Sequence, residues 1–233
     1  MNTQQTKQTD YKKLVAKAAQ KINEGNIGSA VKYAGSAFNQ NANSPQAAGE
    51  YLFCLNELGR FDETLAAAKR IPKKETLQNE TVLANILCAA LAVENEKIPE
   101  AMNLLSKLGL NTAQGRRKAF ANFNYNPAQT SLIFNTAMVM HKAGKQADAE
   151  GLLQDTIEHI IFFIDNDENI DGALSREQAE VIREFMLLIS ESEQFASLEN
   201  GEAWQELAAL TAVGSHQTKK KKNQNKTNGG EKK

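Results

Sequence analysis

Apolar side chains recur every three or four residues along most of the chain, the spacing that places them on one face of an α-helix. In residues 61–71, for example, Leu65, Ala68 and Ile71 share one face. Runs of β-branched residues are short and there are only 4 prolines, so the pattern predicts an all-α fold. The segments expected to be helical are 11–24, 28–39, 45–58, 61–71, 76–93, 98–108, 127–142, 146–164, 175–192 and 202–213.

The breaks within successive pairs of helices share a pattern. Gly25, Gly59 and Gly144 each end one helical segment, and Glu96 stands at the equivalent place in another copy. Glycine adopts a positive φ at little cost, so it commonly terminates helices. The four turn positions lie 34, 37 and 48 residues apart along the chain. Five residues after each turn position stands a small residue of the next helix: Ala30, Thr64, Ala101 and Ala149.

A period near 34 residues, built from helix–turn–helix units with a small residue at a fixed offset, resembles the tetratricopeptide repeat (TPR). The resemblance covers residues 11–163. It implies an α-solenoid of TPR-like antiparallel helical hairpins whose concave groove binds a partner. The aromatic residue usual near the start of the first helix is missing, and Glu96 stands where glycine is usual. An unrelated helical bundle with similar hairpins is the alternative.

In TPR proteins the first helix of each hairpin lines the groove, so the resemblance assigns a lining to this chain. The residues at those positions are Gln46, Gly49, Phe53, Asn56, Leu83, Ile86, Ala90, Ser131, Phe134, Asn135, Met138 and His141. Chaperone-binding TPR domains hold a C-terminal carboxylate with Lys, Arg and Asn at such positions, whereas this set is mostly apolar. We therefore expect a protein partner that offers an apolar helical or extended segment. The alternative is that some of these residues pack against the neighbouring hairpin.

A narrower resemblance rests on three segments, which read Leu-Gly-Arg-Phe-Asp-Glu-Thr-Leu-Ala at 58–66, Asn-x-x-Cys-Ala-Ala at 85–90 and Phe-Asn-Thr-Ala at 134–137. With an acidic Asp-Gly loop and a Lys-rich tail, they resemble the TPR portion of the 72-kDa subunits of the signal recognition particle. This resemblance implies a cytoplasmic ribonucleoprotein for co-translational targeting, in which the array holds a partner subunit and the tail contacts RNA. The chain is far shorter and lacks that family's Pro- and Trp-containing RNA-binding motif.

The net charge of −1 is divided unevenly along the chain. Residues 214–233 carry seven lysines and one glutamate, a charge of +6, which leaves −7 on the other residues. The tail has no residues for an apolar core, so we expect it to be disordered. The predicted organisation is a disordered N-terminus at 1–10, a helical-repeat domain at 11–213 and a disordered tail at 214–233. The tail is a candidate RNA contact through Lys219, Lys220, Lys221 and Lys222, and a solubilising role is the alternative.

Residues 109–126 interrupt the repeat and are predicted to form a long loop. A basic triplet followed by spaced aromatic residues occupies this insertion: Arg116, Arg117, Lys118, Phe120, Phe123 and Tyr125. Positive charge beside aromatic rings suits a single-stranded nucleic acid, whose phosphates it neutralises and whose bases it stacks. The alternative is that the aromatic side chains fold back onto the array.

The acidic segment 165–178 resembles an EF-hand calcium loop beginning at Asp167. The twelfth position of such a loop needs a bidentate Glu, and here it is Gln178. We therefore predict a solvated acidic loop, with Ser175 capping the next helix. A calcium-responsive adaptor is the alternative.

The sequence contains no recognisable catalytic motif. The 3 histidines are dispersed, and neither a Gly-rich phosphate loop nor a nucleophile elbow occurs. Cys54 and Cys88 lie on apolar helical faces and are expected to be reduced thiols. We expect a non-catalytic protein without metal or cofactor. No apolar run is long enough to span a membrane, and the first residues lack the apolar segment of a secretory signal, so a cytoplasmic location is expected.

Overall fold

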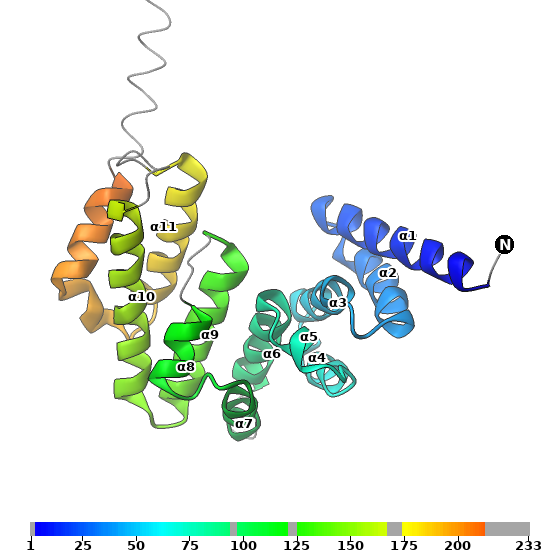
Figure 1. The fold of residues 1–233 in the computed structure, drawn as a ribbon, viewed down its shortest axis with the longest axis horizontal. Helices are drawn as coiled ribbons and strands as arrows, with labels where there is room; N and C mark the ends of the chain where they lie inside the picture. The colour runs from blue at the N-terminus through cyan, green and yellow to red at the C-terminus, as the bar shows by residue number, and fades with distance from the viewer. Residues whose placement is uncertain (1–2, 94–96, 121–124, 167–173, 213–233) are drawn as a thin grey trace, which may run out of the picture.

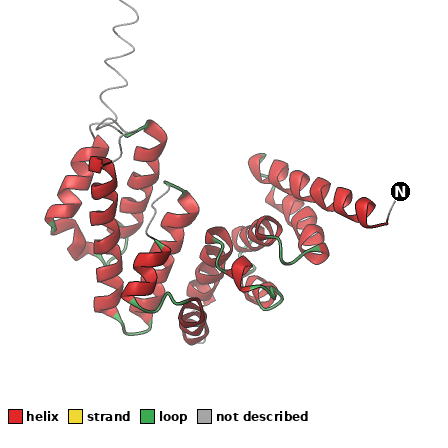
Figure 2. Ribbon diagram, viewed as in Figure 1, coloured by secondary structure: helices red, strands yellow, loops and turns green. Residues whose placement is uncertain are grey.

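The computed structural model describes residues 3–93, 97–120, 125–166 and 174–212, and this part of the chain contains helices but no strands (Figures 1 and 2). The helices are α1 (Thr3–Asn23), α2 (Ile27–Gln40), α3 (Pro45–Glu57), α4 (Phe61–Ala68), α5 (Lys74–Leu77), α6 (Glu80–Val93), α7 (Ile98–Leu108), α8 (Ala113–Ala119), α9 (Pro127–Lys142), α10 (Gln146–Asn166), α11 (Arg176–Ser190), the 3-10 helix η1 (Ala196–Asn200) and a helix over 202–212. The all-α prediction is confirmed for these residues.

Most helices lie within a few residues of the predicted segments, and three departures matter. The first helix begins at Thr3, eight residues before its predicted start. The segment predicted as one helix from 76 to 93 is divided into α5 and α6, and the Oδ1 atom of Asn79 caps α6 by accepting a hydrogen bond from the Val82 N–H at 3.3 Å. The insertion, predicted to be a loop, contains the helix α8.

The predicted turn glycines have the backbone geometry that ends a helix. Gly25, Gly59 and Gly144 all have positive φ, between 68° and 76°. After Gly59 the N–H of Arg60 donates to the Leu55 carbonyl at 2.8 Å, so the chain closes the helix with a Schellman-type bond. The fourth predicted turn position, Glu96, lies outside the described residues. Three of the four turns predicted from the sequence are therefore confirmed.

The small residues at the fixed offset are all buried. Ala30, Thr64 and Ala149 are fully buried, and Ala101 is nearly so. A small side chain allows two helices to approach closely, which explains why each copy places one at this position. Each copy of the sequence pattern therefore places its small residue in the core.

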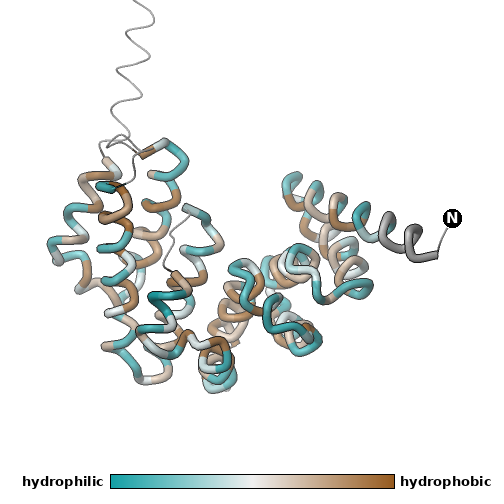
Figure 3. The backbone as a smooth tube through the Cα atoms, in the orientation of Figure 1, coloured by the Kyte–Doolittle hydropathy of each residue, from teal (hydrophilic) through white to brown (hydrophobic). Residues whose placement is uncertain are grey.

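The helices pack in a regular order along the molecule. Helix α3 contacts both α2 and α6, α4 packs on α6, and α6 packs on α9. Helices α7, α10 and α11 all contact α9. Figure 1 shows the succession from α1 to α11, and Figure 3 shows α6, which lies between α3 and α9, as mostly hydrophobic. None of the helices in the described ranges is long and apolar enough to cross a membrane.

The isoleucines at the apolar end of α10 are buried, whereas Phe162 is exposed. Ile160 and Ile164 lie in one core cluster with Ile182 and Phe185 of α11. Trp204 and Leu207 of the last helix complete the same cluster. Burial in this shared cluster stabilises the packing of α11 on α9 and joins α10 and residues 202–212 to the same core.

Candidate binding site

The residues predicted to line a groove on α6 lie in the core instead. Leu83 and Ile86 are only 1% and 4% exposed, and Ala90 is equally buried. These side chains point into the core and not to the surface that α6 shares with α3, so the prediction that they line a groove there is wrong. The physical reason is that α6 is apolar on most of its circumference, and hydrophobic periodicity then gives no indication of the outward face. The outward stripe of α6 contains Thr81, Asn85 and Cys88.

On α9, the predicted groove residues are covered by the C-terminal part of the domain. The Phe195 ring lies 6.4 Å from the Phe134 ring and 5.7 Å from the His141 ring, both edge-on. The Ser192 hydroxyl donates to the Met138 sulfur at 3.7 Å. These three α9 residues therefore pack against the following segment, which is the alternative interpretation, and each is only partly exposed. Ser131 remains partly exposed.

Two predicted groove asparagines hold α6 between its neighbours. Asn56 of α3 donates from Nδ2 to the Asn85 carbonyl at 2.9 Å, and Asn135 of α9 donates to the Ala84 carbonyl at 3.1 Å. The Thr64 hydroxyl donates to Asn56 Oδ1 at 2.7 Å. Gly49 marks a further close approach, because a Cβ atom there would lie 3.1 Å from the Thr81 side chain. These residue types are thus explained by helix packing.

Helix α3 has an outward-facing stripe that overlaps the predicted lining in part. It consists of the predicted residues Gln46 and Phe53 together with Glu50 and Glu57, at successive spacings of four, three and four residues. The Asn56–Asn85 hydrogen bond places it beside the outward stripe of α6. We call these two stripes the α3–α6 face: Gln46, Glu50, Phe53, Glu57, Thr81, Asn85 and Cys88. The face carries the carboxylates of Glu50 and Glu57 and lacks the buried Leu83, Ile86 and Ala90, so it is more polar than the predicted lining.

Glu50 is the unusual residue of the α3–α6 face. Its Oε1 atom accepts a hydrogen bond from Gln46 Nε2 at 3.0 Å, while its buried Oε2 atom has no hydrogen-bond partner among the described residues. Burial raises the pKa of the Glu50 carboxyl, against the opposing effect of the Gln46 hydrogen bond. Burial, with the charges of Glu50 and Glu57 added, also raises the pKa of Cys54 to about 11, so this thiol is unreactive.

A separate cleft opens between α4 and α7, over the side of α6 turned away from Thr81 and Cys88. Its volume is about 340 Å³. Ile86 and Ala90, predicted to line the groove, lie in its floor. We call it the α4–α7 cleft: Leu65, Ala68, Lys69, Ile71, Leu77, Ile86, Ala90, Lys97, Glu100, Ala101, Asn103, Leu104 and Lys107.

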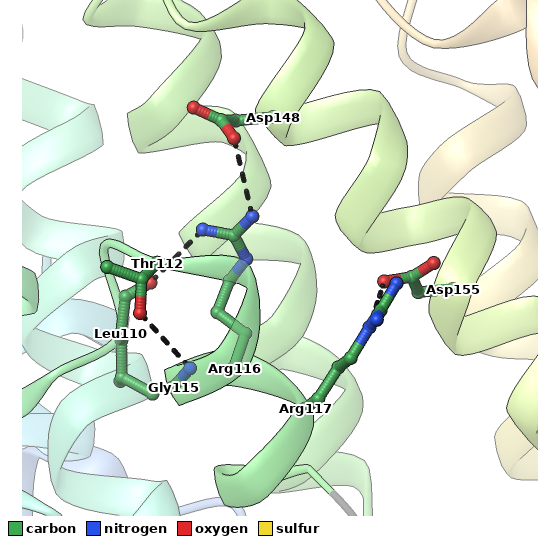
Figure 4. Close-up of polar contacts among 7 residues, drawn as sticks. All are labelled: Leu110, Thr112, Gly115, Arg116, Arg117, Asp148 and Asp155. Atoms are coloured by element: carbon green, nitrogen blue, oxygen red, sulfur yellow. Dashed lines mark hydrogen bonds and ion pairs between the residues drawn. The ribbon is translucent and has the colours of Figure 1, made fainter.

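The basic triplet of the insertion is largely neutralised within the molecule (Figure 4). Arg116 is 5% exposed, and its guanidinium lies 3.6 Å from the Asp148 carboxylate and donates to the Leu110 carbonyl at 3.4 Å. The exposed Arg117 pairs with Asp155 at 3.1 Å, also on α10. Both arginines hold α8 against α10, so the prediction that they contact RNA is wrong for Arg116 and unsupported for Arg117. Lys118 is exposed.

The other candidate segments are described only in part. Phe120 and Tyr125 pack against the cores, as the fold-back alternative predicted, and Phe123 lies outside the described residues. The same is true of Lys219, Lys220, Lys221 and Lys222, and of residues 167–173 in the EF-hand-like segment.

The predicted helix cap beside the acidic segment is confirmed. Ser175 Oγ accepts from the Gln178 N–H at 3.2 Å, and Gln178 Oε1 accepts from the Ser175 N–H at 2.9 Å. Gln178, at the position of the calcium-binding Glu, thus serves a capping box. Across the described ranges, no three His, Cys, Asp or Glu side chains form a group suited to a metal ion.

Comparison with known proteins found no matching family model, no matching curated protein and no matching solved structure.

Proposed function

We propose that the chain is a TPR-like helical-repeat scaffold, a non-catalytic protein that binds a segment of a protein partner on the α3–α6 face. The packing order supports this proposal. Each first helix of a hairpin, α3, α6 and α9, contacts the next one, and the second helices α4 and α7 pack on the first helix that follows. Repeated packing of this kind gives extended surfaces composed of equivalent helix faces, which repeat proteins use for binding.

The observation that carries the proposal is the unpaired Oε2 atom of Glu50. A buried acceptor without a donor costs roughly 1–3 kcal/mol, and more when it is charged. Here the cost falls on a partly exposed face that also carries Phe53, three residues further along α3. If the Glu50 side chain rotates outward, a partner that brings a backbone N–H or a Lys or Arg side chain to its carboxylate removes that cost on binding. The preferred partner segment is therefore rich in donors, with an apolar residue for Phe53.

The test uses a matched pair of variants. Gln146 and Glu150 of α10 repeat the Gln46–Glu50 pair, since Gln146 donates to Glu150 at 2.8 Å, yet no oxygen of Glu150 is buried without a partner. Wild type, Glu50→Gln and Glu150→Gln are each used to capture partners from source cells, and captured proteins are quantified by mass spectrometry. The proposal predicts a partner retained by wild type and Glu150→Gln and lost with Glu50→Gln. Equal capture by all three variants would refute it.

The narrower form of the proposal is a subunit of a ribonucleoprotein such as the signal recognition particle. It is supported by the segments at 58–66, 85–90 and 134–137 and by the Lys-rich tail. Because Arg116 and Arg117 are paired with aspartates, RNA binding in this form depends on Lys219 to Lys222. Sequencing of RNA that co-purifies with the full chain tests it, with enrichment of one particle RNA as the expected result.

A further inference from the structure

The α4–α7 cleft is built in two layers. Its floor consists of side chains that are almost completely buried, among them Ile71, Ile86 and Ala101. Its walls consist of partly buried apolar side chains, with Leu65 of α4 and Leu104 of α7 contacting the core on both sides. The cleft thus offers apolar surface at the junction of two core clusters. Among the described residues, no side chain fills it.

Positive charge surrounds this apolar floor. Three lysines line the cleft: Lys69 directly after α4, Lys97 directly before α7, and Lys107 within α7, with Glu100 as the one acidic residue of the lining. The Glu100 carboxylate lies 3.1 Å from Lys97 Nζ and 3.7 Å from Lys69 Nζ. The hydrogen bond from Lys97 is the largest cause that lowers the pKa of Glu100, and the charges of Lys69 and Lys97 add to it. Lys107 has no acidic partner among the described side chains within ion-pair distance. The cleft lining therefore carries a net charge of +2 on a chain whose first 213 residues sum to −7.

We propose that the α4–α7 cleft is a second docking surface, which takes an acidic amphipathic helical segment of a partner protein. The apolar side of such a segment fits the leucine-walled floor, and its carboxylates meet Lys69, Lys97 and Lys107. The bounding helices have 8 and 11 residues, about 12 to 17 Å, which matches two to three turns of a bound helix. A volume near 340 Å³ is at the lower end of the range of about 300–1,000 Å³ for binding clefts, so a few anchor side chains fill it.

The preference for an acidic protein segment follows from the apolar floor of the cleft together with the lysines around it. A single-stranded RNA satisfies the lysines and leaves the apolar floor without a matching group. A basic segment, including the chain's own Lys-rich tail, meets like charge. The positively charged cleft is a different surface from the α3–α6 face, which carries carboxylates. Binding at the cleft is therefore independent of the function proposed above.

The test uses a fluorescein-labelled peptide of about 12 residues with leucines spaced as on one face of a helix and Asp and Glu elsewhere. Its binding to the full-length chain is measured by fluorescence anisotropy. Two further peptides serve as comparisons: a scrambled peptide of the same composition and a peptide with Lys and Arg in place of the acids. The acidic amphipathic peptide is expected to bind more tightly than both, and equal binding by either comparison peptide overturns the proposal.

Two sets of variants locate the site. Lys69→Glu with Lys107→Glu should weaken peptide binding by about tenfold or more at low salt, whereas the exposed control pair Lys13→Glu with Lys32→Glu should not. Glu100→Gln removes the competing carboxylate, so it should tighten binding by about two- to fivefold, the effect of one exposed ion pair. Circular dichroism verifies that each variant is folded.

Several results would overturn the proposal. These are the absence of saturable peptide binding, equal weakening by the control pair, and no gain with Glu100→Gln. Tighter binding of a single-stranded RNA that is lost with Lys69→Glu and Lys107→Glu would reassign the cleft to nucleic acid. A dimer in sedimentation experiments that the same two substitutions dissociate would reassign it to a second copy of the chain.

Discussion

At the scale of single residues, Glu50 combines a stability cost with a candidate binding role. The pKa of its carboxyl is raised above the ordinary value of 4.5 by burial. A raised pKa means that the folded state prefers the protonated form, so the stability linked to this group is present below pH 4.5 and is lost as pH rises through the folded-state pKa. We predict that Glu50→Gln raises the melting temperature at pH 7 and that the difference disappears as pH falls towards 4. Differential scanning fluorimetry across this pH range measures it, with Glu150→Gln as the control that should show no such trend.

Glycine at position 115 is a second residue-scale feature. A Cβ atom at Gly115 would lie 1.7 Å from the Gly109 carbonyl oxygen, a backbone atom that cannot move aside cheaply. In contrast, a Cβ atom at Gly151 of α10 would have no atom within 4 Å. Gly115→Ala should therefore destabilise the protein and displace α8, whereas Gly151→Ala should stabilise it by about 0.5–1 kcal/mol because alanine loses less backbone entropy in a helix. Urea denaturation compares the two, and a stabilising Gly115→Ala would contradict the close contact.

At the scale of elements, Phe195 decides whether the inner side of α9 is open or covered. It is fully buried and packs edge-on against Phe134 and His141. We predict that Phe195→Ala lowers the free energy of unfolding by about 3–5 kcal/mol, as expected for removal of a buried ring. Phe162→Ala is the matched control, because Phe162 is 60% exposed and its loss should cost little. Equal effects of the two substitutions in urea denaturation would mean that Phe134 and His141 are open to a partner after all.

The helix boundaries could largely be predicted from the sequence because local chemistry determines them. Gly25, Gly59 and Gly144 end helices through their own backbone geometry, and Ser175 begins α11 through its own hydroxyl. Helix faces could not be predicted equally well. On α6, apolar residues surround most of the helix, so only its packing between α3 and α9 distinguishes Thr81, Asn85 and Cys88 from the core.

The same distinction applies to the candidate sites. The α3 stripe of Gln46, Glu50, Phe53 and Glu57 has helical spacing that a sequence can reveal, and the prediction included two of these residues. The α4–α7 cleft joins side chains up to 42 positions apart, from Leu65 to Lys107, and depends on how far α4 stands from α7. The pairing of Arg116 and Arg117 with α10 is likewise tertiary, since their partners Asp148 and Asp155 follow 32 and 38 residues later. Charge composition alone cannot distinguish such paired arginines from free ones.

At the scale of the whole molecule, the main contrast is between an acidic body and a basic tail. Removal of residues 214–233 changes the net charge from −1 to −7 and deletes no apolar side chain. The truncated chain should therefore keep its circular dichroism spectrum and its melting temperature. Its affinity for single-stranded RNA should fall sharply at low salt, because Arg116 and Arg117 are already paired with Asp148 and Asp155.

Salt dependence gives this last prediction a quantitative form. Neutralisation of about four phosphates by the tail gives a slope of log affinity against log salt near −3 on single strands. Full-length protein should show that slope in a filter-binding titration, and the truncated chain should show neither the slope nor measurable affinity. A matched full-length variant with Lys219, Lys220, Lys221 and Lys222 changed to Gln should behave like the truncation, since it removes four of the tail's seven lysines. Equal RNA binding by the full-length and truncated proteins would instead place the RNA contact on the helical body, where Lys118 is exposed beside the paired arginines.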